Sequence, residues 1–173
     1  MPPGAGAPRP YPLPIAAPPG PPFLLLLDGL EDDRNLGYTL RTAEAQDKEP
    51  IDAGTVYFAP PDYHLLVDAG PRLALSVDEP VHFSRPSIDV LFESAADLYG
   101  ERLMGMLLSG ANQDGARGLA AIGAAGGLTI VQAPGSASMS AMPQSALDLM
   151  DPHHILAPSE IASLLAELQM RRI

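Results

Sequence analysis

Cysteine and tryptophan are absent from this chain of 173 residues, and basic side chains are scarce, with 10 Lys and Arg against 21 Asp and Glu. Without cysteine there are no disulfides, no thiolate metal sites and no cysteine nucleophile. The formal net charge of −11 argues against binding nucleic acid or an anionic membrane by electrostatic attraction. We therefore expect no nucleic-acid partner.

Long apolar runs are missing too. No run approaches the roughly 20 residues that a membrane-spanning helix needs. The first residues lack the basic segment and continuous apolar stretch of a secretory signal. Together with the absence of cysteine, these features lead us to expect a cytoplasmic protein without membrane insertion.

Proline is concentrated at the N-terminus, where residues 1–22 hold ten of the twenty prolines. Proline removes backbone donors and restricts the backbone, so neither a helix nor a central strand is expected there. We interpret residues 1–22 as a disordered, proline-rich tail and residues 23–173 as one α/β domain. A ligand for a proline-binding domain and a misread start of the sequence are the alternative interpretations of the tail.

Short apolar or β-branched runs within 23–173 predict strands. The expected strands are Phe23–Leu27, Tyr38–Ala43, Thr55–Ala59, His64–Asp68, Arg72–Val77, Leu103–Leu108, Leu128–Gln132 and His154–Leu156. Two of them, 64–68 and 72–77, flank a tight Ala-Gly-Pro connection and predict an antiparallel hairpin at one edge of the sheet.

Helical spacing of apolar residues predicts four helices. They cover 87–99 with Ser87 as N-cap, the segment after Asp114 to about 125, 143 to about 150, and 158–170. In the second half, strands alternate with helices. This alternation predicts a doubly wound, mostly parallel sheet with helices on both faces.

The stretch from Leu103 to Gly126 is predicted to form the central strand, turn and helix of the domain. An apolar strand enters the polar turn 109–113, which delivers Asp114 to the start of a helix. Functional groups of α/β domains lie beyond the carboxyl ends of such strands. Asp114 can cap its own helix or orient a histidine in a hydrolytic triad, and the residues alone leave both roles open.

From Ala43 onward the chain resembles the catalytic domain of CheB-type chemotaxis protein-glutamate methylesterases. The matching segments are 43–67, AEAQDKEPIDAGTVYFAPPDYHLLV; 82–96, HFSRPSIDVLFESAA; 107–127, LLSGANQDGARGLAAIGAAGG; and 142–146, MPQSA. They follow the order of the family and cover about three quarters of the chain. Several motifs in the family's order identify the family more specifically than any single motif does.

The resemblance implies a Ser-His-Asp hydrolase that uses no metal or organic cofactor. Its implied partners are the cytoplasmic helices of methylated chemoreceptors, where it hydrolyses glutamate methyl esters and releases methanol. Some members also deamidate receptor glutamines. By motif match, Asp114 is the triad aspartate. The implied site-lining residues are Ser109, Gly110, Gly115, Met142 and Pro143.

The other triad members are not found. Asp28 stands at the position of the family histidine, after the 23–27 strand, and no serine occurs before Ser76. Nothing in residues 1–22 resembles the G-A-S-x-G-G nucleophile turn, so the first strand and that turn are missing. We expect an impaired methylesterase or, alternatively, a catalytically silent binding module in a chemosensory complex. We also expect self-association through an exposed sheet edge.

The remaining histidines and loop serines are weaker candidates. We expect a structural role for His64, a surface role for His82, and no metal site at His153-His154. The serines at 136, 138 and 140 lie in the loop before Met142, where a replacement nucleophile is conceivable.

Overall fold

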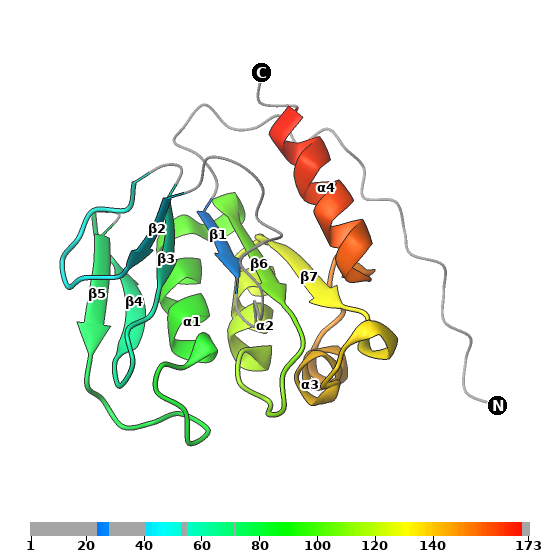
Figure 1. Ribbon diagram of the computed structural model, residues 1–173, viewed down its shortest axis with the longest axis horizontal. Coiled ribbons are helices and arrows are strands. Elements are labelled where there is room, and N and C mark those ends of the chain that lie inside the picture. Colours follow the sequence, from blue (N-terminus) through cyan, green and yellow to red (C-terminus); the bar gives the residue numbers. More distant parts are fainter. Residues whose placement is uncertain (1–23, 28–40, 53–54, 71, 171–173) are drawn as a thin grey trace.

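The computed structural model describes residues 24–27, 41–52, 55–70 and 72–170 (Figure 1). Four parallel strands form its main sheet in the order β1-β6-β7-β8. Their bounds are Leu24–Leu27 for β1, Leu103–Leu107 for β6, Leu128–Gln132 for β7 and His154–Leu156 for β8. Leu27 pairs with Met106, and Leu107 pairs with Val131, so these strands end at the same edge. The predicted parallel α/β sheet is confirmed.

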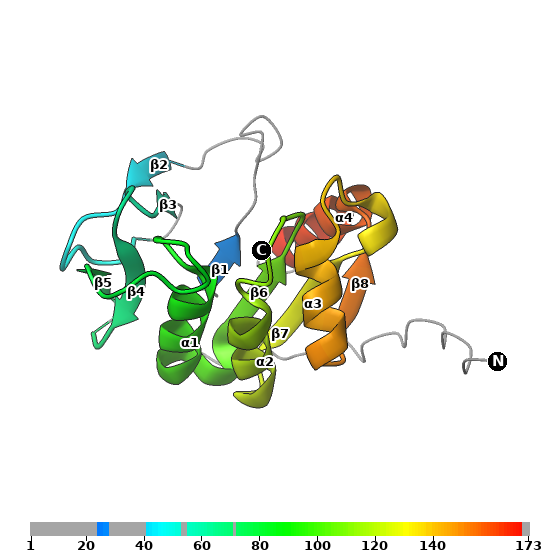
Figure 2. The same cartoon turned by 90° about the horizontal axis from the view of Figure 1, so that it is seen from below.

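Helices cover both faces of this sheet (Figures 1 and 2). The helices are α1 (Ile88–Tyr99), α2 (Ala116–Ala124), α3 (Ala141–Leu149) and α4 (Pro158–Met170), with short 3-10 turns η2 (Gly100–Arg102) and η3 (Pro134–Ser136). Leu103 and Leu107 of β6 share a core with residues of α1, α2 and α3. Met104 and Met106 pack with Ile161 of α4 instead. Because successive side chains of a strand point to opposite faces, all of β6 is buried.

The N-terminal strands form two separate pairs beside the main sheet (Figure 2). Parallel β2 (Arg41–Glu44) and β3 (Thr55–Phe58) make one, and antiparallel β4 (His64–Asp68) and β5 (Arg72–Ser76) make the other. The antiparallel hairpin is confirmed, but its predicted place at the edge of the main sheet is wrong. Val67 of β4 packs instead with the α1 core, and its N–H donates to Ser94 Oγ of α1 at 3.0 Å.

Helix boundaries follow the local sequence closely. Helix α4 has the predicted bounds, and α3 begins at Ala141, two residues before the expected start at Pro143. Proline is tolerated there because the N–H groups of a first turn have no intrahelical partner. Within the described residues, no helix is both long and apolar enough to cross a membrane.

Candidate functional site

Asp114 lies at the carboxyl edge of the main sheet, in the turn from β6 to α2, and is only 2% exposed. Gly115 follows as N-cap of α2 with φ of 90°. A Cβ atom at this glycine would lie 2.6 Å from a side-chain carbon of Leu107. Glycine therefore allows both the left-handed backbone and the close packing that bring Asp114 to this edge.

The carboxylate of Asp114 caps helix α1, not the helix that follows it. Its Oδ2 accepts the Ile88 N–H at 2.8 Å. Its Oδ1 accepts the Asp89 N–H at 3.0 Å and the Ser87 hydroxyl at 2.7 Å. Ser87 is the N-cap residue, as predicted, yet its side chain makes no capping bond to its own helix. Of the two roles that the residues left open for Asp114, capping of its own helix is not observed, because the first-turn N–H groups of α1 reach its carboxylate instead.

Asp89 makes the reciprocal connection from α1 to α2. It is completely buried, and its Oδ1 accepts the Gly118 N–H of α2 at 2.7 Å. A Cβ at Gly118 would come within 2.5 Å of Phe92 Cβ, so the helices approach closely because this residue has none. Sequence reasoning saw Asp89 only as a favourable first-turn residue, since no local pattern reveals a bond to another helix.

The second carboxylate oxygen of Asp89 differs from the first in its hydrogen bonding. Among the described residues, Oδ2 has no hydrogen-bond partner, although it is buried. His82 Nε2 lies 3.5 Å from it and Arg117 Nε lies 3.7 Å from it. Arg117 also contacts Glu93 at 3.2 Å. A buried carboxylate needs compensation of this kind, because removal from water strongly disfavours its charge.

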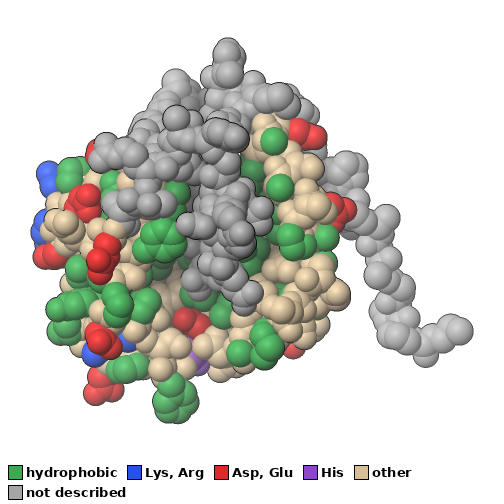
Figure 3. Space-filling model, in the orientation of Figure 1, with side chains coloured by type: hydrophobic (Ala, Val, Ile, Leu, Met, Phe, Trp, Pro, Cys, Tyr) green, Lys and Arg blue, Asp and Glu red, His purple; other side chains and the backbone are tan. Residues whose placement is uncertain are grey.

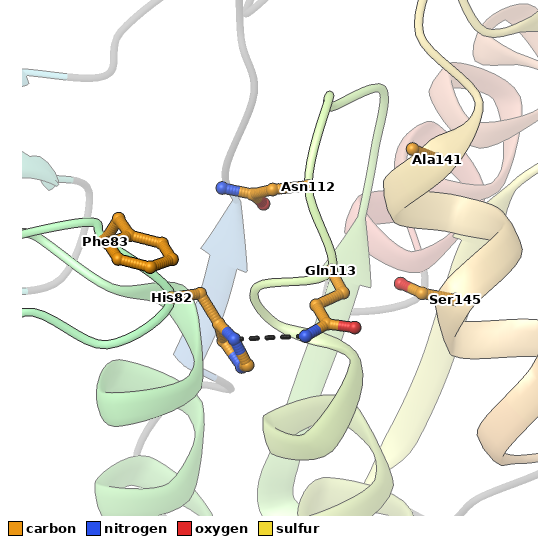
Figure 4. A pocket seen from close by; sticks show the side chains of 6 residues that line it. All are labelled: His82, Phe83, Asn112, Gln113, Ala141 and Ser145. Atoms are coloured by element: carbon orange, nitrogen blue, oxygen red, sulfur yellow. Dashed lines mark hydrogen bonds between the residues drawn. The ribbon is translucent and has the colours of Figure 1, made fainter.

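His82 also lines a pocket (Figure 4). The pocket has a volume of about 450 Å³ and is lined by His82, Phe83, Asn112, Gln113, Ala141 and Ser145. Gln113, which precedes Asp114, places its Nε2 3.2 Å from His82 Nδ1. The His82 side chain is 30% exposed. The predicted surface role is therefore incomplete: this histidine joins the Asp114 turn to Asp89.

None of the five predicted lining residues is among those that line this pocket in the described structure. Gly110 and Met142 join two loops, with the Gly110 N–H donating to Met139 O at 3.0 Å and the Met142 N–H donating to Gly110 O at 3.0 Å. The Ser109 hydroxyl accepts the Met139 N–H at 2.9 Å. Pro143 is buried. The pocket wall itself comes from their neighbours Asn112, Gln113, Ala141 and Ser145.

The other candidates lie apart from this pocket. His64 is buried and bonds through Nε2 to the Glu79 carbonyl at 3.1 Å, in keeping with a structural role. His153 Nδ1 accepts the Thr129 N–H at 3.1 Å. No cluster of three or more potential metal ligands occurs in the part of the chain that the structure describes. Asp28 and residues 1–22 lie outside that part.

The fold and the site define an α/β domain with a buried aspartate turn and a pocket at the carboxyl edge of its parallel sheet. Comparison with known proteins gives the family. The family model for CheB methylesterase matches residues 34–165. The catalytic domain of the Thermotoga maritima CheB methylesterase superposes with a TM-score of 0.68 at 28% identity, covering 72% of this chain and 68% of that one.

Similar proteins carry names from the same family. A Leptospira interrogans protein is 44% identical over 134 residues, which are 78% of this chain and 69% of that protein. The Symbiobacterium thermophilum protein-glutamate methylesterase/protein-glutamine glutaminase is 41% identical over 119 residues, which are 69% of this chain and 33% of that protein. The chain belongs to the CheB methylesterase family of chemotaxis proteins, and the predicted resemblance is confirmed.

Proposed function

We propose that this chain is a chemotaxis protein-glutamate methylesterase that hydrolyses glutamate methyl esters on chemoreceptor helices slowly, with deamidation of receptor glutamines as its second reaction. The observation that carries the proposal is the Asp114 turn, buried at the carboxyl edge of the sheet beside an open pocket of about 450 Å³. The family membership supports the substrate class.

The proposed rate is low because only one triad member is recognisable. Loss of a triad serine or histidine leaves mainly the contribution of binding and oxyanion donors, about 10³ to 10⁴ over water in a well-studied triad. Asp114 itself already accepts three hydrogen bonds from the start of α1. Its charge is therefore used first to hold α1, whether or not it also orients an imidazole.

The proposed partners and location follow from the same family. Methylated cytoplasmic helices of chemoreceptors are the partners, in the cytoplasm, and the proposed hydrolysis uses no cofactor. Acidic side chains outnumber basic ones on the face in Figure 3, so a basic partner surface is favoured over an acidic one. Among the described strands β1 is an outer strand, which supports the proposed self-association through a sheet edge.

A catalytically silent binding module is the second candidate. The hydrogen bonds of Asp114 favour it, because three donors from α1 give this carboxylate a sufficient structural role without any histidine. In this case the domain binds receptor helices and releases no methanol.

Methanol release from methylated receptor separates the two candidates. The assay compares the native chain with Asp114→Asn, which keeps the side-chain shape, and with Asp97→Asn, an exposed position on α1, as the matched control. Release above buffer that Asp114→Asn reduces and Asp97→Asn leaves unchanged supports the esterase. Binding of receptor without release, by a chain that circular dichroism shows to be folded, supports the silent module.

A further inference from the structure

The loop that carries His82 has a strained backbone. Val81 and Ser84 exchange both backbone hydrogen bonds, at 3.1 and 2.8 Å, around a two-residue turn. The central residues His82 and Phe83 have φ of 49° and 63°. Turns with two positive φ values are normally formed by Asn-Gly or similar pairs, and bulky residues are outliers there.

Burial does not compensate for this strain, because the Phe83 side chain is fully exposed. Left-handed backbone costs an L-residue about 1–2 kcal/mol. Strain of this kind clusters where it helps to position a functional group. Here it holds the His82 ring at the pocket next to Gln113 (Figure 4). The ring Nε2 lies 3.5 Å from Asp89 Oδ2.

The contacts of the imidazole determine which nitrogen carries its proton. An amide nitrogen can only donate, so Gln113 Nε2 donates to His82 Nδ1 across 3.2 Å. The neutral ring then carries its proton on Nε2, which faces the otherwise unpartnered Asp89 Oδ2 at 3.5 Å. This arrangement matches the logic of a triad, in which a buried carboxylate sets the tautomer and leaves the other nitrogen as the base.

We propose that His82, oriented by Asp89, is the proton acceptor of this site. A water molecule displaces the Gln113 amide from His82 Nδ1 and is the nucleophile whose proton this nitrogen accepts. The inference rests on the proposed methylesterase function and deepens it. The sequence suggested Asp114 as the carboxylate that orients an imidazole. The carboxylate that faces an imidazole in the described structure is Asp89.

The hydrolysis balances without a serine nucleophile. His82 Nδ1 takes a proton from the water as the water oxygen bonds to the ester carbonyl carbon. The tetrahedral intermediate then breaks its bond to the methoxy oxygen, which takes the proton from Nδ1 and leaves as methanol. The glutamic acid formed loses its proton to solvent. The freed Gln113 Nε2 and the nearby Asn112 amide are the side-chain donors on the pocket wall for the developing oxyanion.

Other charged groups lie around the His82–Asp89 pair. Arg117 of α2 contacts Glu93 of α1 at 3.2 Å, and Asp114 lies in the adjoining turn. Arg117 is 3.7 Å from the same Asp89 oxygen that His82 faces, so it partly balances the carboxylate charge.

Four variants test the proposal: His82→Gln, Asp89→Asn, Asp97→Asn and His153→Gln. Asn at 89 keeps an oxygen for the Gly118 N–H but presents an NH₂ group to the imidazole, so Nε2 loses the carboxylate that fixes its proton. Removing a general base costs about 10²- to 10⁴-fold. We expect at least a 10²-fold loss of kcat/KM in the first two variants. The last two remove an exposed carboxylate of α1 or another histidine and should retain native rates.

Two substrates and one spectroscopic readout make the outcomes distinct. The substrates are methylated receptor and p-nitrophenyl acetate, a small activated ester that needs no receptor. ¹⁵N NMR of His82 should report a proton on Nε2 in the native chain and a mixture of the two tautomers in Asp89→Asn, a change that a purely packing role would not produce.

Losses with both esters together with the tautomer change support the proton-acceptor role. A His82-dependent rate on the small ester without receptor demethylation overturns the proposed function but keeps this inference. Native turnover that survives His82→Gln overturns the inference and keeps the function. Absence of turnover with either ester overturns both.

Discussion

Two buried carboxylates at the junction of α1 and α2 differ sharply in how they are satisfied. Asp114 accepts three hydrogen bonds from the start of α1. Asp89 accepts one from α2 and leaves Oδ2 facing His82 and Arg117 without a hydrogen bond. A fully bonded carboxylate stabilises a fold, whereas an incompletely bonded one is available to polarise a neighbour. This difference is the basis of our proposal that Asp89 takes part in the chemistry, and it gives Asp114 a structural role in holding α1.

Asp114→Ala should have the largest effect on stability. It leaves two backbone N–H groups and the Ser87 hydroxyl without their acceptor, and each orphaned buried group costs about 1–3 kcal/mol. We expect the free energy of unfolding in urea to fall by about 4 kcal/mol, against less than about 0.5 kcal/mol for exposed Asp97→Ala. A loss below about 1 kcal/mol would show that Asp114 does not hold α1.

Gly118→Ala tests the close approach of the helices that the two carboxylates connect. Intrinsic helix propensity favours alanine by about 1 kcal/mol. The new Cβ would lie 2.5 Å from Phe92 Cβ and 3.0 Å from Asp89 Cα, so steric repulsion should dominate. We expect a net loss of about 2 kcal/mol in denaturant unfolding.

Gly135→Ala is the matched control for that substitution, because a Cβ there meets no atom within 4 Å. Its free energy of unfolding should stay within about 0.5 kcal/mol of the native value. Equal stability of the two alanine variants would contradict the tight α1–α2 contact.

Phe83→Gly should increase stability while lowering activity. Glycine relieves the positive φ of this position, for a gain of up to about 1 kcal/mol in thermal or urea unfolding. Phe83→Ala removes the same ring and keeps the strain, so it should give no gain. If both variants were equally stable, the exposed ring and not the backbone would be responsible. A looser loop should also position His82 less well for ester hydrolysis.

The smallest expected effect concerns His154, away from the pocket. Burial, and secondarily the charge of His153, hold the pKa of His154 below its ordinary value of 6.5. The unfolded chain therefore binds this proton more readily, and stability falls as the pH drops below about 6.5. His154→Gln should flatten this dependence between pH 7.5 and 5.5 only slightly, by about a few tenths of a kcal/mol, since the side chain is only partly buried and solvent screens its charge. Methanol release should not change.

Local sequence was sufficient for most elements of the second half of the chain. The apolar 103–108 run, the small-residue helix after it and the 158–170 periodicity each have one good structural solution, because burial on both faces of a parallel sheet requires continuous apolar strands. The antiparallel pairing of 64–68 with 72–76 was equally clear. Its position was not, because the alternation of a hairpin identifies its apolar face but not the layer that covers that face.

The sequence by itself determined the family, the α/β class and the place of Asp114 beyond a central strand, because these depend on motifs and on the periodicity of neighbouring residues. Only the tertiary structure decided what each carboxylate does. The bonds from Asp114 to α1 and from Asp89 to α2 join residues about 25 to 29 positions apart. Such pairings depend on how two helices pack, and a local sequence pattern does not predict them. His82 and Asp89 are close in sequence, but the left-handed turn at His82 and Phe83 that brings them together has no apolar pattern to predict it, so this contact too came from the structure.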